Sequence, residues 1–130
     1  MSAALYNPPS LARPRGYSHA AAATGKTIAL AGQIGWDAAG KLASGFAAQF
    51  AQALDNLVVA LNAAGGGAED LLSLRIYVVD KKQYLAATKE VGVAYRAQLG
   101  THYPAMALVQ VADLLEDGAL VEIEGLAVVA

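Results

Sequence analysis

Hydrophobic residues recur every three to four positions between residues 46 and 64, which is the spacing of one helix face. The stripe starts at Phe46 and Phe50 and continues through leucine and valine. Ser44 stands where an N-cap residue is expected. The three glycines at 65–67 end the helix, because glycine tolerates the left-handed conformation past a helix end. The pattern therefore predicts one long helix over this segment.

A second helix is predicted from residue 80 to residue 99. Asp80 is a suitable N-cap residue, and Gln83 stands three positions later, as in a capping box. Apolar and aromatic residues then follow at helical spacing, and Gly100 marks the end.

Short apolar runs predict five strands, at residues 18–23, 27–33, 71–79, 105–112 and 119–130. We expect the first two to form a hairpin, because a link that contains Gly25 joins them. Residues 1–16 contain three prolines and are expected to be an extended arm.

The element order β-β-α-β-α-β-β predicts a single α+β domain over residues 1–130. Crossover connections are almost always right-handed, so both helices should cover the same face of one mixed sheet. The last strand nevertheless carries Leu120, Leu126 and Val128 on the face opposite its main apolar row. A strand that is apolar on both faces is usually buried on both, which favours a homo-oligomer.

The composition excludes several classes of protein. Apolar residues make up 56% of the chain and charged residues 15%, so disorder is not expected. A net charge of −2 argues against a nucleic-acid binder. The absence of cysteine excludes disulfides and a thiol nucleophile. No run reaches the roughly 20 apolar residues of a membrane span, and no secretory signal is recognisable, so we expect a cytoplasmic protein.

Glu122 and Glu124 are the sharpest chemical feature of the sequence. They stand two positions apart in an apolar run, so both side chains share one face of a strand. A carboxylate in apolar surroundings tends to have a raised pKa, which suits general acid–base catalysis. The alternative is an ordinary solvated strand face that carries two carboxylates.

Other candidate residues are more ambiguous. Tyr17 could donate a hydrogen bond in a pocket, and His19 could act as a base or be purely structural. Gly32, near the end of a strand, could let a ligand approach the backbone or simply belong to a turn. The two histidines, His19 and His102, lie too far apart in sequence to suggest a metal site. No nucleotide-binding motif is present.

Several short motifs together resemble the RidA family of the Rid superfamily, also called YjgF or endoribonuclease L-PSP. They occur in order over nearly the whole chain: Asn7-Pro8, Gly16-Tyr17-Ser18-His19-Ala20, Ala31-Gly32-Gln33, Gln52-Ala53-Leu54-Asp55-Asn56-Leu57, Ala63-Ala64-Gly65, Tyr77-Val78-Val79-Asp80, Tyr103-Pro104-Ala105 and Val121-Glu122-Ile123-Glu124.

The resemblance implies a chorismate-mutase-like two-layer fold and a homotrimer, in which three sheets surround a central barrel. Ligand clefts would lie between neighbouring subunits. RidA is an enamine and imine deaminase that needs no cofactor, and it hydrolyses 2-aminoacrylate-type intermediates to 2-oxo acids and ammonia. The resemblance assigns Tyr17 to the substrate pocket and Glu122 to the attacking water. It also assigns the backbones of Gly32 and Leu108 to substrate contacts.

Met106 departs from the RidA pattern. In RidA an arginine follows the Pro-Ala pair and binds the substrate carboxylate, whereas this chain has a thioether at that position. Arg15 or Arg75 could compensate. Two readings therefore remain open: a hydrolase acting on a small imine, enamine or related substrate, or a non-enzymatic trimer that binds a metabolite or a protein. A ribonuclease or translation inhibitor is disfavoured by the net charge of −2.

Overall fold

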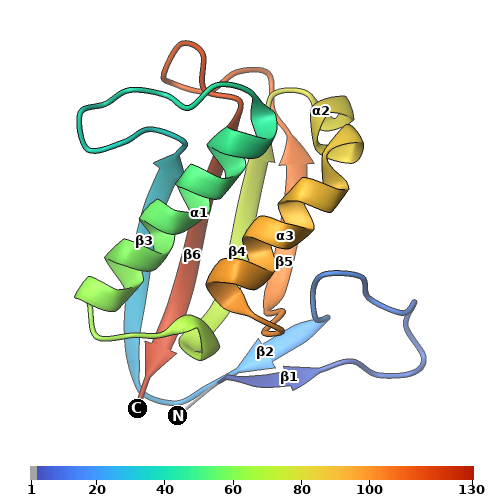
Figure 1. The fold of residues 1–130 in the computed structure, drawn as a ribbon. Helices are drawn as coiled ribbons and strands as arrows, with labels where there is room; N and C mark the ends of the chain where they lie inside the picture. The colour runs from blue at the N-terminus through green and yellow to red at the C-terminus, as the bar shows by residue number, and fades with distance from the viewer. Residues whose placement is uncertain (1–2) are drawn as a thin grey trace.

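A four-stranded mixed sheet lies beneath a layer of helices in the computed structural model, which describes residues 3–130 (Figure 1). The strand order is β3-β6-β4-β5, and only β4 and β5 run parallel. The strand bounds are Lys26–Ile34 for β3, Leu71–Val78 for β4, Ala105–Gln110 for β5 and Val121–Val129 for β6. This arrangement confirms the predicted α+β class and the mixed sheet.

All three α-helices lie on one face of the sheet, as predicted (Figure 1). Their bounds are Phe46–Ala63 for α1, Lys81–Ala86 for α2 and Thr88–Leu99 for α3, and a 3₁₀ turn, η1, covers Ala68–Asp70. Helix α1 lies over β3 and β6 and packs beside α3. Among residues 3–130, no helix is both long and apolar enough to span a membrane.

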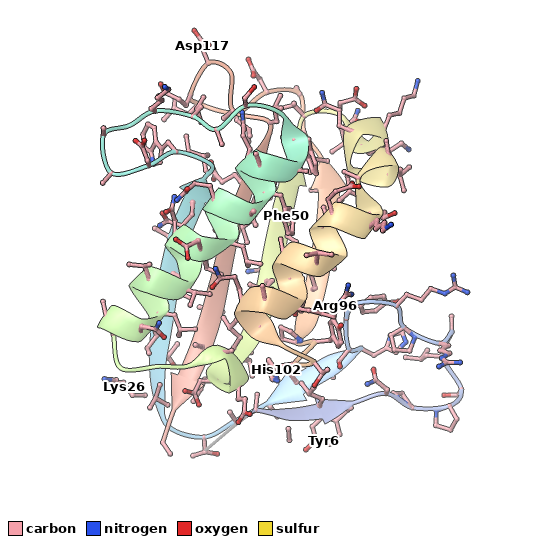
Figure 2. The ribbon with its side chains drawn as sticks, viewed as in Figure 1. Tyr6, Lys26, Phe50, Arg96, His102 and Asp117 are labelled. Atoms are coloured by element: carbon pink, nitrogen blue, oxygen red, sulfur yellow. The ribbon has the colours of Figure 1, made fainter. Side chains whose placement is uncertain are left out.

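The core lies between the helices and the sheet. The predicted stripe of α1 is buried, and Phe50 points from this helix toward the strands (Figure 2). On β6, the odd-numbered residues from Val121 to Ala127 are buried beneath the helices, whereas Glu122 and Glu124 are half-buried on the other face. That second face has no helix over it (Figure 1).

The predicted hairpin between residues 18–23 and 27–33 is wrong. Strand β2 (Ala20–Ala22) pairs instead with β1 (Ala4–Tyr6), inside the segment that we expected to be a plain arm. Asn7 explains this pairing, because its side chain accepts a hydrogen bond from the backbone of His19 and donates one to Ser18. The three alanines of β2 would bury little surface whether they paired with β1 or with β3, so these polar contacts favour β1 as the partner strand.

The helix termini also differ from the prediction. The N-cap of α1 is Gly45, with φ of 87°, and no side chain caps the helix, so the assignment to Ser44 is wrong. Asp80 caps α2 by accepting a hydrogen bond from the backbone of Lys82, as predicted. Gln83 does not complete a capping box, because its side-chain oxygen is buried without a hydrogen-bond partner among residues 3–130.

The predicted helix over 80–99 is divided at Ala87. The backbone there has φ of −111° and ψ of 16°, and its N–H donates to Tyr84, only three residues back. Tyr84 packs edge-on against Phe46, with ring centroids 6.3 Å apart, while Val91 is buried in the core.

Candidate functional site

Glu122 and Gly32 lie against each other where β3 pairs with β6. The register of β3 shifts between Leu30 and Gln33, so Gly32 sits in an irregular stretch of the strand. A Cβ atom built on Gly32 would collide with Oε2 of Glu122. Any side chain at position 32 would therefore displace the carboxylate, and the glycine is needed for this close approach.

The two glutamates on β6 have different surroundings. Glu122 is opposite Tyr77 on β4, and Glu124 is opposite Arg75. The Tyr77 hydroxyl donates to Oε1 of Glu124 at 2.5 Å, and not to its direct neighbour across the strands. This hydrogen bond to the carboxylate raises the pKa of Tyr77 above its usual range. The Glu124 carboxylate is thus engaged by a hydrogen bond within the sheet. Glu122 is therefore the better candidate for an acid–base role.

Tyr17 lies at the far edge of the sheet, beside β5. The preceding loop reaches this edge because the backbone N–H of Ser18 donates to the carbonyl of Pro104 at 3.0 Å. A cavity of about 270 Å³ opens there, lined by Tyr17, His19, Arg75 and Met106 among others. Of the cations that could replace the missing arginine, Arg75 is therefore the one that shares a cavity with Tyr17.

His19 has a structural contact. Its Nε2 lies 2.7 Å from the carbonyl oxygen of Ala12, and its ring meets that of Tyr17 edge-on, with centroids 5.4 Å apart. These contacts hold the N-terminal loop in place. His102 also contacts backbone, since its Nε2 lies 2.8 Å from the carbonyl oxygen of Leu71.

Met106 and Leu108 share one side of β5. Met106 is opposite Leu74 and Leu108 is opposite Ile76, and both pack at the margin of the helix-covered core. Met106 also borders a second cavity, on the helix side, which Arg15 lines. The two arginines that could compensate for Met106 thus lie in two different cavities on either side of it.

Within one chain, the predicted site residues form two separate groups. Gly32 and Glu122 meet on β3 and β6, whereas Tyr17, Met106 and Leu108 gather at β5. Strand β4 lies between β6 and β5, so the groups do not meet. Sequence reasoning missed Tyr77, because its contact with Glu124 depends on the pairing of β4 with β6. No cluster of metal-binding side chains occurs among the described residues.

Comparison with known proteins identifies the family. The family model for endoribonuclease L-PSP matches residues 9–129. The chain belongs to this family. The Rid-family protein YyfB from Yersinia pestis, described as of unknown function, is 33% identical, with 99% of this chain and 100% of that chain covered and a TM-score of 0.86.

Two further Rid-family structures give the same result. RidA from the Antarctic bacterium Psychrobacter is 34% identical, with 91% of this chain and 92% of that chain covered and a TM-score of 0.70. A YjgF-family member from Mycobacterium tuberculosis is also 34% identical, with 88% and 87% covered and a TM-score of 0.67. No curated protein matches the chain. The resemblance to the Rid family is therefore confirmed.

Proposed function

We propose that this Rid-family chain hydrolyses a small imine, enamine or related metabolite in clefts between the subunits of a homotrimer. The observation that carries the proposal is the placement of Glu122. Glu122 is half-buried, its carboxylate lies against the backbone of Gly32, and the Tyr77 hydroxyl donates its hydrogen bond to Glu124 and not to Glu122. A carboxylate in that position can hold and activate a water molecule.

The proposed reaction needs one base and one oriented substrate. Glu122 accepts a proton from water as the water oxygen bonds to the imine carbon. The same proton then goes to the imine nitrogen, which gives a carbinolamine. Glu122 next transfers the hydroxyl proton of this intermediate to the amine nitrogen. The carbon–nitrogen bond then breaks, and ammonia leaves as the carbonyl of the 2-oxo product forms. Tyr17 orients the substrate, and the backbones of Gly32 and Leu108 contact it, by similarity to RidA.

The division of the site into two groups supports a homotrimer. Gly32 and Glu122 lie toward the β3 side of the sheet, and Tyr17 and Met106 lie at its β5 edge. A second copy whose β5 edge meets the β3 side of the first would complete the site. Substrate binding would then depend on assembly of the subunits, because neither half of the site suffices for the reaction by itself. The cytoplasmic location stays a prediction.

Ammonia release from 2-iminobutyrate and 2-iminopropionate tests the proposal. Glu122→Gln should lower kcat/KM by about a hundredfold or more, because a lost general base typically costs 10²–10⁴ in rate. Glu124→Gln is the matched control and should retain most of the activity. Wild-type protein that is trimeric and folded but releases no ammonia above background would overturn the hydrolase proposal, as would an unimpaired Glu122→Gln variant.

One observation favours a non-enzymatic binding module instead. Met106 packs at the margin of the apolar core, and a thioether cannot pair with a carboxylate. In that case 2-oxobutyrate should bind equally well to wild type and Glu122→Ala in calorimetry, and no substrate should turn over. A ribonuclease role would require RNA cleavage by the purified protein that survives the same substitution.

A further inference from the structure

His19 lies beside Tyr17, the residue that orients the substrate in the proposed reaction. The two rings meet edge-on, with centroids 5.4 Å apart and planes at 80° to each other. On its other side the His19 ring reaches the backbone, where Nε2 lies 2.7 Å from the carbonyl oxygen of Ala12. A carbonyl oxygen can only accept a hydrogen bond, so Nε2 carries a proton in this contact. The imidazole is therefore held by the backbone while it contacts Tyr17.

The backbone on which the His19 side chain stands is itself fixed. The Asn7 side chain accepts a hydrogen bond from the backbone N–H of His19 at 2.8 Å and donates one to Oγ of Ser18 at 3.2 Å. Ser18 is only 4% exposed, and its backbone N–H donates to the carbonyl of Pro104. Residues 18 and 19 are thus joined to the end of β1 and to the start of β5.

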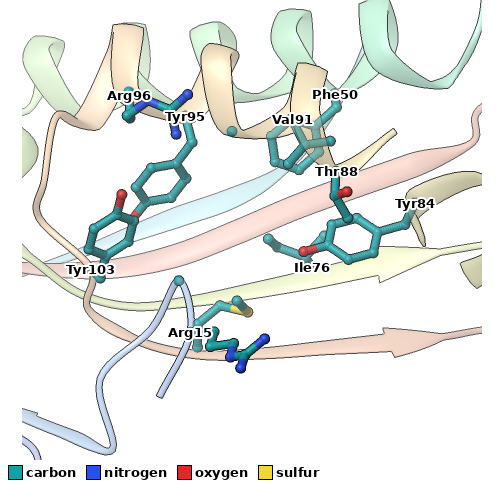
Figure 3. A pocket seen from close by; sticks show the side chains of 12 residues that line it. Arg15, Phe50, Ile76, Tyr84, Thr88, Val91, Tyr95, Arg96 and Tyr103 are labelled. Carbon is teal, nitrogen blue, oxygen red and sulfur yellow. The ribbon is translucent and has the colours of Figure 1, made fainter. Parts of the chain in front are cut away.

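Tyr17 stands on the other side of residue 18, directly after a turn. Gly16 has φ of 75°, in the region that favours glycine. Before the turn, Arg15 lines the cavity on the helix side together with Tyr95 (Figure 3). After the turn, Tyr17 lines the other cavity, which it shares with Arg75. The loop therefore sends neighbouring side chains into different cavities, and the ring of Tyr17 needs a contact that keeps it in its own.

We propose that His19 is a positioning residue that fixes the ring, and with it the hydroxyl group, of Tyr17. The hydrogen bond to Ala12 holds the imidazole, and the imidazole restricts the rotation of the Tyr17 side chain. A ring held in one orientation presents its hydroxyl group at one place, so less freedom is lost when the substrate is oriented. The role of His19 in catalysis rests on the proposed function, in which Tyr17 orients the substrate.

Two other roles for His19 make different predictions. A general base would act on the substrate or on water, and its effect would not depend on the Tyr17 hydroxyl group. A purely structural residue would stabilise the N-terminal loop, and its replacement would lower stability without a specific link to Tyr17. Coupling between His19 and the Tyr17 hydroxyl group therefore distinguishes positioning from both alternatives.

A double-mutant cycle on ammonia release from 2-iminobutyrate measures this coupling. His19→Ala should lower kcat/KM by about tenfold, mainly through kcat, because the substrate still binds but is less well oriented. Tyr17→Phe removes the hydroxyl group that His19 positions, so adding His19→Ala to this variant should cost less than about twofold. A full tenfold loss in the Tyr17→Phe background would overturn the proposal, as would a wild-type rate for His19→Ala itself.

A conservative variant and a matched control complete the kinetic test. His19→Phe keeps an aromatic ring beside Tyr17 and should recover part of the rate that His19→Ala loses; a rate no higher than that of His19→Ala would contradict positioning by the ring. His102→Ala is the control, because Nε2 of His102 also contacts a backbone carbonyl, that of Leu71, and His102 lines a different cavity. It should keep the wild-type rate. An equal loss in both alanine variants would indicate a general effect on the fold and overturn the proposal.

Nuclear magnetic resonance tests the contact without the reaction. In protein with isotope-labelled tyrosine rings, the spectrum of Tyr17→Phe identifies the Tyr17 signals among those of the six tyrosines. These signals should show Overhauser effects to the His19 ring, and in His19→Ala they should shift toward those of a mobile, exposed tyrosine. Unchanged signals would overturn the proposal even if ammonia is released. Wild-type protein that releases no ammonia would overturn the hydrolysis alone, and the spectra would still decide whether His19 positions Tyr17.

Discussion

Met106 lies on the helix-facing side of β5, opposite Leu74, and borders the cavities of both Arg15 and Arg75. A long side chain at this position therefore has space on either side of the strand. The thioether fills part of that space without offering a hydrogen-bond donor. At this residue the chain presents an apolar surface, and a thioether cannot form a charge-assisted pair with a carboxylate.

Met106→Arg should raise the rate of ammonia release from 2-iminobutyrate. The new guanidinium can pair with the substrate carboxylate, and a hydrogen bond to a charged group contributes about 1.5–3 kcal/mol, equivalent to a ten- to hundredfold gain in kcat/KM. Met106→Leu is the control, because it keeps the position apolar and should leave the rate unchanged. An equal rate for the arginine and leucine variants would show that the pocket geometry differs from that of RidA.

The candidate site shows how far single residues can be interpreted from sequence. The two-residue spacing correctly placed Glu122 and Glu124 on one strand face. It could not separate their roles, because the hydroxyl that engages Glu124 belongs to Tyr77 on another strand. The contact between Gly32 and Glu122 could not be predicted from the sequence either, because it depends on a register shift in β3.

At the scale of elements, hydrophobic periodicity located the long helices and the strands of the sheet. It did not show which strands pair with each other. Strands β3, β4, β5 and β6 form near their predicted positions, within the few residues by which strand ends vary. The pairing of β2 with β1 was not predictable, because a run of three alanines carries no hydrophobic pattern. A single side chain, Asn7, supplies the contacts that decide it.

Gln49 joins three elements of the fold. It is only 3% exposed, and its amide donates to the carbonyls of Ala43 and Gly118, while its oxygen accepts the backbone N–H of Leu120. One side chain on α1 thus holds the loop before that helix and the loop before β6. Sequence patterning did not reveal this role, since glutamine on a helix is usually solvated.

Gln49→Met should lower the free energy of unfolding by about 2–4 kcal/mol, because it leaves buried backbone groups without partners. Urea denaturation at a fixed protein concentration measures the change, since assembly would make stability depend on concentration. Gln52→Met is the control. Gln52 makes one side-chain hydrogen bond, to Asn56, and its replacement should cost less than about 1 kcal/mol. Equal midpoints for the two variants would contradict the bridging role.

At the scale of the whole molecule, the isolated chain exposes more surface than its size predicts. Its accessible surface is 7272 Å². A folded monomer of this mass exposes about 6,500 Å². Part of the excess lies on the sheet face without helices, where Leu126 and Tyr77 are only half-buried. The low charge of 15% fits the same interpretation, in which neighbouring subunits cover this face.

Leu126→Lys should therefore break the proposed homotrimer. The residue lies on the open face of β6, beside Ser73 of β4, and an interface that buries this face would enclose an unpaired ammonium group. Sedimentation should give about three times 13.3 kDa for wild type and a single-chain mass for the variant. Leu115→Lys is the matched control, because Leu115 is 100% exposed in a loop and should remain trimeric. A Leu126→Lys variant that is folded by circular dichroism yet still trimeric would place the interface elsewhere.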